Sequence, residues 1–246
     1  MARAVLALML LSLAAPAVGD TLPPIAPRFV VAEYTAIAIV TSDAPEIGVD
    51  RTSGGCSGTL IAPDLVLTAA HCAHGRVAAP ERLHVTFGWR DDGPPLWRSP
   101  AAAITLHHGY RPGTLPVEDL PTDLALIHLP RPVPAEIVAP IPYRPEPAAD
   151  LVAVYGYANG HDRILRGHAE CPAARLTPGL YGLACQLVSG FSGGPVLREG
   201  TDGPEVVGVA VAIIPGAQVG VQAFAAVPLP DLIGDAAGDS PLPATE

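Results

Sequence analysis

The chain has 246 residues, of which 49% are hydrophobic and only 15% charged, with a formal net charge of −10 and no lysine. This length allows one large domain or two small ones with a sizeable core. Affinity for nucleic acid depends on neutralising phosphates, so an acidic chain without basic runs is not expected to bind nucleic acid. The 25 glycines and 29 prolines are spread along the chain, which disfavours long helices and favours short strands joined by turns.

Residues 1–19 have the layout of a secretory signal peptide. Arg3 gives a basic start, residues 4–13 form an apolar run, and small residues lead to a cleavage site near Gly19. The apolar run is shorter than the roughly 20 residues of a membrane-spanning helix. We therefore expect a secreted or periplasmic protein without membrane association once the signal is removed. Residues 20–28 are rich in proline and are interpreted as an N-terminal segment or a short propeptide.

Short apolar runs with β-branched residues and partial alternation then recur along the chain, separated by Gly, Pro and Asp. This pattern predicts an all-β fold, either a sandwich or a barrel. A helical pattern is found only near the end, at 229–237, and residues 236–246 are expected to be a C-terminal tail. The predicted strands are 34–40, 58–62, 65–69, 82–89, 101–107, 124–129, 151–158, 193–198, 206–214 and 221–227.

The four cysteines of an exported protein are expected to form disulfides, for which three pairings are possible. The pairs Cys56 with Cys72 and Cys171 with Cys185 close two short loops and are favoured. Each such loop stabilises the fold by about 3 kcal/mol in the chain-entropy model. The alternative is that cysteine and histidine side chains bind zinc, as the sequence HCAH at 71–74 could suggest. This sequence has no second cluster at metal-ligand spacing, so no metal is expected.

The string GFSGGP at 190–195 fits two catalytic motifs. One is the nucleophile elbow G-x-S-x-G of α/β-hydrolases, as in a secreted esterase, which requires a histidine downstream of the serine. All eight histidines precede Ser192, and the chain lacks alternating strand–helix units. Both the order and the expected fold therefore argue against the elbow.

The other motif is a triad in the order His, Asp, Ser, which His71, Asp123 and Ser192 can fill. A serine hydroxyl is a poor nucleophile until a histidine within reach takes its proton, and a buried carboxylate orients that histidine. Asp119 is the rival carboxylate, but it precedes a Leu-Pro loop and is expected to be solvated. Glycines around the serine allow a tight turn in which the Gly190 and Ser192 amides can bind an oxyanion.

Three segments resemble the signature blocks of the chymotrypsin/trypsin-like serine proteases: SGTLIAPDLVLTAAHC at 57–72, DLALIHL at 123–129 and GFSGGPVL at 190–197. The resemblance extends over about residues 30–235, so we expect a protease domain at 29–235.

The resemblance implies two six-stranded antiparallel β-barrels with a linker at about 130–147, a short C-terminal helix, and an active site between the barrels. It also implies a monomer that needs no cofactor and acts on polypeptides. The Cys56–Cys72 pair matches the family bridge at the histidine loop. The Cys171–Cys185 pair is similar to that of bacterial secreted relatives of the glutamyl-endopeptidase type, and the Ala-, Pro- and Arg-rich composition also suggests a bacterial source.

One position departs from the family pattern. Phe191 stands where the family usually has an aspartate, which in the digestive enzymes pairs with the N-terminal amine freed by activation cleavage. A phenylalanine cannot form that ion pair, and residues 28–34 lack the usual Ile-Val-Gly-Gly. We hypothesise that packing of Phe191 holds the oxyanion turn instead. The alternative is a latent or inactive protease fold that serves as a binding module.

By position, the resemblance implies that the base of the primary substrate pocket lies near Gln186 and its walls near Ile213 and Gln222. No aspartate is at the base, so a preference for basic side chains is not expected. The bulk of Ile213 and Gln222 predicts a shallow pocket for small or medium uncharged side chains.

Overall fold

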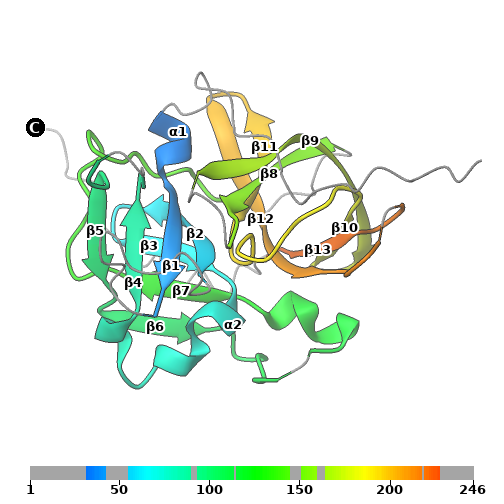
Figure 1. Ribbon diagram of the computed structural model, residues 1–246, viewed down its shortest axis with the longest axis horizontal. Helices are drawn as coiled ribbons and strands as arrows, with labels where there is room; N and C mark the ends of the chain where they lie inside the picture. The colour runs from blue at the N-terminus through cyan, green and yellow to red at the C-terminus, as the bar shows by residue number, and fades with distance from the viewer. Residues whose placement is uncertain are drawn as a thin grey trace, which may run out of the picture.

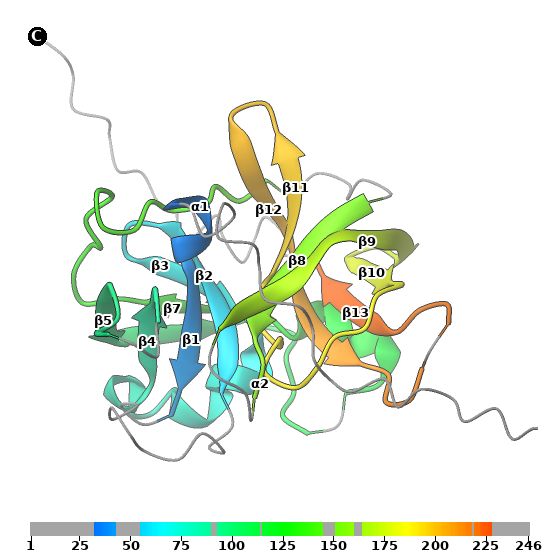
Figure 2. The ribbon, with the colours of Figure 1, turned by 45° about the horizontal axis from the view of Figure 1, so that its top comes forward.

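The computed structural model of the chain describes residues 32–42, 55–89, 93–113, 115–144, 151–159, 164–217 and 219–227. It is mostly β-structure with short helical turns, arranged as two barrel-like sheets side by side (Figures 1 and 2). The predicted all-β, two-barrel class is therefore confirmed.

The elements of the first half are α1 (Ala32–Thr35), β1 (Ile37–Thr41), β2 (Cys56–Ala62), β3 (Leu65–Thr68), α2 (Ala70–Ala73), β4 (His84–Phe87), β5 (Trp97–Pro100), β6 (Ala103–Leu106) and β7 (Ala125–His128), with 3₁₀ turns η2 (His74–Arg76), η3 (Pro80–Arg82) and η4 (Val117–Thr122). Those of the second half are β8 (Leu151–Tyr157), β9 (Leu165–Thr177), β10 (Leu180–Leu183), β11 (Pro195–Gly200), β12 (Gly203–Ile213) and β13 (Ala223–Ala226).

The first sheet contains β1 to β7 in the order β5-β4-β1-β2-β3-β7-β6, all antiparallel. Its two edge strands, β5 and β6, are consecutive in the chain and separated only by residues 101–102. Ala101 donates to Leu83 near one edge and Ala102 donates to His128 at the other. The sheet is thus curled into a half-barrel. The sheet has seven strands and not the expected six, since residues 97–106 form two strands separated at residues 101–102.

The second barrel is closed by six antiparallel strands in the order β10-β13-β12-β11-β8-β9. Register shifts in β8, β10, β11 and β12 bend the strands, as closure of a small barrel requires. Runs such as VVGVAVAI in β12 supply the β-branched and small residues that fill its interior.

The segment that connects the two sheets packs as part of the structure rather than as a loose linker. Val133, Val138 and Ile141 are buried in the first core, and the Ile141 amide donates to Leu60 at 2.9 Å. Further on, the Arg144 amide donates to Val206 of the second barrel. Residues 130–144 of the expected linker therefore contact both sheets.

All ten predicted strands coincide with strands of the structure, although their bounds differ. The prediction for 34–40 is wrong at its start, where Tyr34 and Thr35 belong to the helical turn α1. Three further strands, β5, β9 and β10, were not predicted. The expected signal peptide, the segment 20–28, the C-terminal helix and the tail lie outside the described residues.

Both favoured disulfides are present. Cys56 and Cys72 have their Cα atoms 6.0 Å apart, and those of Cys171 and Cys185 are 5.4 Å apart. The first joins the start of β2 to α2, and the second joins β9 to the segment after β10. In the part of the chain that the structure describes, no helix is long and apolar enough to cross a membrane.

Candidate active site

The histidine and aspartate of the predicted triad are held together by the pairing of β3 with β7. Thr68 lies opposite Ala125 at the end of this ladder, so the segments that follow β3 and precede β7 meet. His71 is in α2, directly after β3, and its Nδ1 is 2.6 Å from Oδ2 of Asp123. The His71 amide donates to the other oxygen, Oδ1, at 2.8 Å. The carboxylate thus fixes both the backbone and the ring of the histidine.

The two side chains differ sharply in exposure. That of Asp123 is 3% exposed and that of His71 is 35% exposed. A buried carboxylate at Nδ1 keeps the proton on that nitrogen, which leaves Nε2 as the acceptor on the solvent side. Asp119, the rival carboxylate, is exposed in η4 and does not approach His71.

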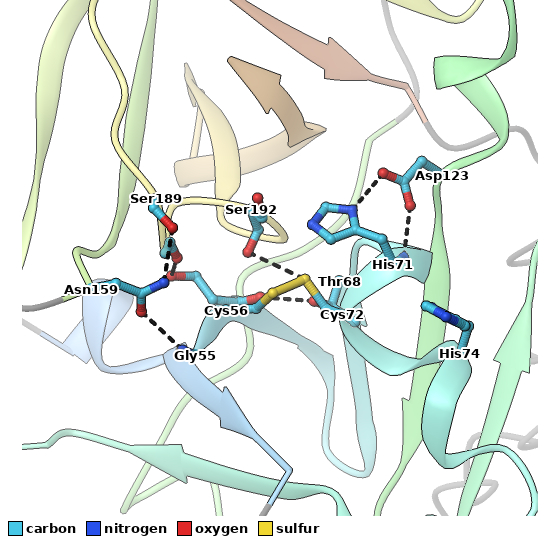
Figure 3. The surroundings of a disulfide bond; sticks show 12 residues. Gly55, Cys56, Thr68, His71, Cys72, His74, Asp123, Asn159, Ser189 and Ser192 are labelled. Atoms are coloured by element: carbon cyan, nitrogen blue, oxygen red, sulfur yellow. Dashed lines mark hydrogen bonds and ion pairs between the residues drawn. A yellow bond between two sulfur atoms is a disulfide. The ribbon is translucent and has the colours of Figure 1, made fainter. Parts of the chain in front are cut away.

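Ser192 reaches the same place from the second barrel. It lies between β10 and β11, and the imidazole of His71 lies between the Asp123 carboxylate and Ser192 (Figure 3). Behind them lies the Cys56–Cys72 disulfide, with Cys72 Sγ 3.8 Å from the Ser192 carbonyl oxygen. A disulfide sulfur has no hydrogen to donate, so this is a packing contact. For the same reason the cluster of Cys56, His71 and Cys72 offers no thiolate to a metal.

Residues 189–194, which we call the serine turn, have their carbonyl groups bonded from outside and inside the turn. The Ser189 oxygen accepts from the Asn159 amide at 2.8 Å, and the Gly190 oxygen accepts from Ser57 Oγ at 2.8 Å. Within the turn, the Phe191 oxygen accepts from the Gly194 amide at 2.8 Å. The Ser192 oxygen accepts from the Ser57 amide at 2.7 Å.

The amide groups of the turn divide into two sets. Those of Phe191 and Gly193 donate to Val188 and Ala210. Those of Ser189, Gly190 and Ser192 have no acceptor among the described residues, and the last two are the expected oxyanion donors. In a trans peptide the N–H points opposite to the C=O of the preceding residue. The Gly190 N–H therefore points away from Asn159, which donates to the Ser189 oxygen, and the Ser192 N–H points away from the Gly194 amide, which donates to the Phe191 oxygen. Two free, fixed amides beside a serine are the donor set that an oxyanion needs.

Glycine is required at one end of this turn for a clear reason. Gly190 has φ of +100°, a backbone conformation that residues with a Cβ rarely adopt. A Cβ there would also overlap the Tyr157 carbonyl oxygen. The φ of Gly190 thus permits the orientation of the peptide groups on both sides of it.

A pocket of about 320 Å³ opens beside the serine turn. Its lining includes Gln186, Ile213 and Gln222, the residues expected at the primary substrate pocket. None of the described residues around it is charged, and its wall from 213 to 217 is apolar. At Gln186, the expected base of the pocket, the carbonyl oxygen lies 2.8 Å from Nε2 of His168, and this hydrogen bond restrains the backbone there.

A family model described as Trypsin matches residues 42–228, well over half of the chain. The chain belongs to the trypsin family. Among solved structures, it is similar to the inactivated protease paralogue S-I1 of the scabies mite, with a TM-score of 0.58 and 24% identity. The match covers 80% of this chain and 90% of that one. At this identity the likeness shows the fold alone.

Within the trypsin-family fold, Phe191 occupies an apolar site. It is 1% exposed and belongs to the core of the second barrel. Gly156 makes room for it, because a Cβ on Gly156 would come within 3.0 Å of the Phe191 backbone and ring. This burial is what the hypothesis of a packed Phe191 requires. Hydrogen bonds from Ser57 and Asn159 also restrain the serine turn, and the sequence did not predict them.

A second polar pair flanks the aspartate. The Tyr110 hydroxyl lies 3.3 Å from Nδ1 of His74, in the turn after α2. Burial, and after it the negative charge of Asp123, raise the pKa of Tyr110. The phenol therefore stays neutral and can keep a hydrogen bond near the carboxylate at physiological pH.

The apolar surroundings of Phe191 give a test. Phe191→Asp places a carboxylate in the core of the second barrel, where burial disfavours its charged form and raises its pKa above the usual value of about 3.9. Above about pH 4 the unfolded chain releases this proton first, so the variant should lose stability as the pH rises. Phe191→Asn, the matched control, should lose roughly 3–5 kcal/mol at every pH, as for truncation of a buried phenylalanine. Urea unfolding of both variants from pH 4 to 8 measures the difference, and equal stabilities throughout would show that the carboxylate has a partner.

Proposed function

We propose that the protein is a secreted serine endopeptidase with the triad His71, Asp123 and Ser192. The observation that supports this most is that His71 carries a buried carboxylate on Nδ1 and has its ring beside Ser192. A polypeptide is the substrate, no cofactor takes part, and the enzyme acts as a monomer.

The reaction begins when Ser192 Oγ attacks the scissile carbonyl carbon. His71 Nε2 takes the hydroxyl proton as the bond forms, and the carbonyl electron pair moves to oxygen. When the tetrahedral intermediate collapses, His71 gives the proton to the leaving amine and an acyl-enzyme remains on Ser192. A water then attacks the ester with His71 again as the base, and the proton returns to Ser192 Oγ.

The Gly190 and Ser192 amides stabilise the negative oxygen of both intermediates. They lack other acceptors among the described residues, so no internal hydrogen bond has to break before they bind the oxyanion. Asp123 stabilises the imidazolium that forms in each step without accepting its proton.

The pocket beside the serine turn accepts the side chain that precedes the cleaved bond. Its uncharged lining and the side chains of Gln186, Ile213 and Gln222 suit small or medium uncharged residues. A charged side chain in such a lining would lose its hydration without gaining a partner.

The place of action follows from residues 1–19 and the disulfides. A signal peptide directs the chain out of the cytoplasm, and two disulfides suit an oxidising compartment. A bacterial source and a likeness to glutamyl-endopeptidase-type enzymes rest on the composition and on the Cys171–Cys185 bridge.

The second candidate is an inactive protease fold that binds a partner. Phe191 in place of the family aspartate favours it, and the similarity to a scabies mite protein described as an inactivated protease paralogue is compatible with it. The presence of all three triad residues in this chain favours the enzyme.

A fluorophosphonate probe tests the triad directly. The wild-type protein should form an adduct on Ser192, located by mass spectrometry, and Ser192→Ala should form none. Asp123→Asn should retain the fold but lose about 10⁴-fold in kcat, because the imidazole is no longer held in the correct tautomer. Asp119→Asn is the matched control and should keep wild-type activity, because that carboxylate is exposed and the carboxylate bonded to His71 is that of Asp123. A folded wild-type protein without an adduct would favour the binding module.

The segment at 20–28 gives a second test. A protein that starts at residue 20 should hydrolyse peptides as fast as one that starts at residue 29, because Phe191 cannot use a newly freed amine. Steady-state kinetics of the two forms measure this. A large gain on removal of 20–28 would mean that the turn is assembled by cleavage after all.

Cleavage of a fluorogenic peptide library tests the pocket. Peptides with small or medium uncharged residues before the cleaved bond should be preferred over those with charged or large aromatic ones. Ile213→Ala should widen the slot and raise kcat/KM for large side chains by about tenfold, the effect of a few methylene groups in an apolar pocket. Leu151→Ala removes an exposed aliphatic side chain that does not line the pocket and should leave the profile unchanged. A wild-type preference for acidic or basic residues would contradict the proposed specificity.

A further inference from the structure

Ser57 of β2 has every polar group bonded although it is completely buried. Its amide donates to the Ser192 oxygen at 2.7 Å, and its carbonyl accepts from Thr68 Oγ1 at 2.7 Å. Its Oγ accepts from the Tyr157 amide at 2.9 Å and donates to the Gly190 oxygen at 2.8 Å. One residue of the first sheet thus contacts both the serine turn and β8 of the second barrel.

The direction of the hydroxyl hydrogen is fixed by this arrangement. The Gly190 carbonyl can only accept, so the Ser57 hydroxyl must donate to it. The Tyr157 amide can only donate, so it occupies a lone pair of the same oxygen. The hydroxyl therefore links the serine turn to β8 of the second barrel and fixes their relative position.

The carbonyl that Ser57 holds is the one that most needs a restraint. Gly190 rotates more freely than a residue with a Cβ, and it is the glycine of the turn whose amide has no acceptor among the described residues. Rotation about the backbone bonds of Gly190 would turn this free donor away from an oxyanion. A fixed Gly190 carbonyl on one side and the Asn159 bond to the Ser189 carbonyl on the other leave the amide one orientation.

We propose that Ser57 is a positioning residue for catalysis. Its hydroxyl holds the serine turn in the conformation that binds an oxyanion. In the digestive enzymes an ion pair of the family aspartate does this, and Phe191 cannot form that ion pair. Ser57 touches neither substrate nor reacting atoms, and it acts through Gly190. This inference rests on the proposed function, in which the turn stabilises an oxyanion.

The closing experiment compares Ser57→Ala with Thr59→Val. Thr59 lies two residues along the same strand, is equally buried, and its hydroxyl has no hydrogen-bond partner among the described residues. Both variants remove one buried hydroxyl from β2, but only the first removes a bond to the turn. Ser57→Ala should lower kcat on a peptide ester by about tenfold to a hundredfold, less than loss of an oxyanion donor itself, with KM unchanged. Thr59→Val should leave both constants at wild-type values.

A peptide aldehyde separates a positioning role from a structural one. Ser192 Oγ adds to the aldehyde carbon, its proton passes to His71, and the new oxyanion occupies the same amides as in catalysis. Its inhibition constant should rise by the factor by which kcat/KM falls, because both depend on oxyanion binding. Ser57→Thr keeps the hydroxyl and should recover most of the lost kcat. Unchanged kcat and aldehyde affinity in Ser57→Ala, or equal losses in Thr59→Val, would overturn the proposal.

Hydrogen exchange keeps the test independent of activity. In Ser57→Ala the amides of Phe191, Gly193 and Gly194 should exchange at least about tenfold faster than in wild type or Thr59→Val, while those of β3 and β7 are unchanged. If the wild-type protein fails to form a fluorophosphonate adduct, the proposed function fails, and exchange alone then decides whether Ser57 orders the turn. If Ser57→Ala does not fold, Ser57→Gly replaces it, because the smaller residue leaves space for a water at the buried Tyr157 amide. The same losses of kcat, aldehyde affinity and protection from exchange are expected in that variant. Exchange in the turn at the wild-type rate would refute the role of Ser57.

Discussion

The hydrogen bonds that Ser57 makes to the serine turn join two sheets that otherwise contribute separate halves of the site. His71 and Asp123 depend on the β3–β7 ladder of the first sheet, whereas Ser192 and the free amides depend on the second barrel. Neither sheet alone places a base beside a nucleophile. The bond between the Ser57 amide and the Ser192 carbonyl fixes the distance across this boundary, and Phe191 anchors the turn from the other side by packing into the second core.

The two halves of the site are held by different physical means. The histidine and aspartate are fixed by strand register and by a buried carboxylate, which are strong but local constraints. The serine turn has no regular structure, so each of its peptide groups needs an individual partner or a function. Among the described residues, the amides of Ser189, Gly190 and Ser192 remain free, and the last two are those that we propose bind the oxyanion. The site is therefore defined as much by the hydrogen bonds that the turn makes as by those that it leaves unmade.

The pairing of His71 with Asp123 and most of the fold could be predicted from the sequence, because these depend on local patterns. His71 follows an apolar strand, Asp123 precedes another, and the glycines of 190–194 mark the turn. The strand β9 was missed since most of its 13 residues are exposed or half-buried and include charges and Pro172, so no alternation is visible. The four-residue β5 and β10 were too short to show a pattern. Ser57 was missed for another reason: its partner Gly190 is 133 positions away, on the other side of the boundary between the sheets. A serine beside a cysteine carries no sign of that contact. Asn159 was missed because its partner Ser189 lies 30 positions away in an irregular segment.

The replacement of a charge by Phe191 changes how the turn can be controlled. An aspartate at this position requires a cation in a buried site, and an N-terminal amine supplies it only after cleavage and only while protonated, below a pKa of about 8. A phenylalanine in an apolar core together with a neutral serine hydroxyl needs neither event, and nothing in this pair titrates near neutral pH. The cost is that the hold on Gly190 is a single neutral hydrogen bond, weaker than a charge-assisted one. Burial compensates for this weakness, because a Gly190 carbonyl that rotated away would leave the Ser57 hydroxyl hydrogen without an acceptor in a site from which solvent is excluded.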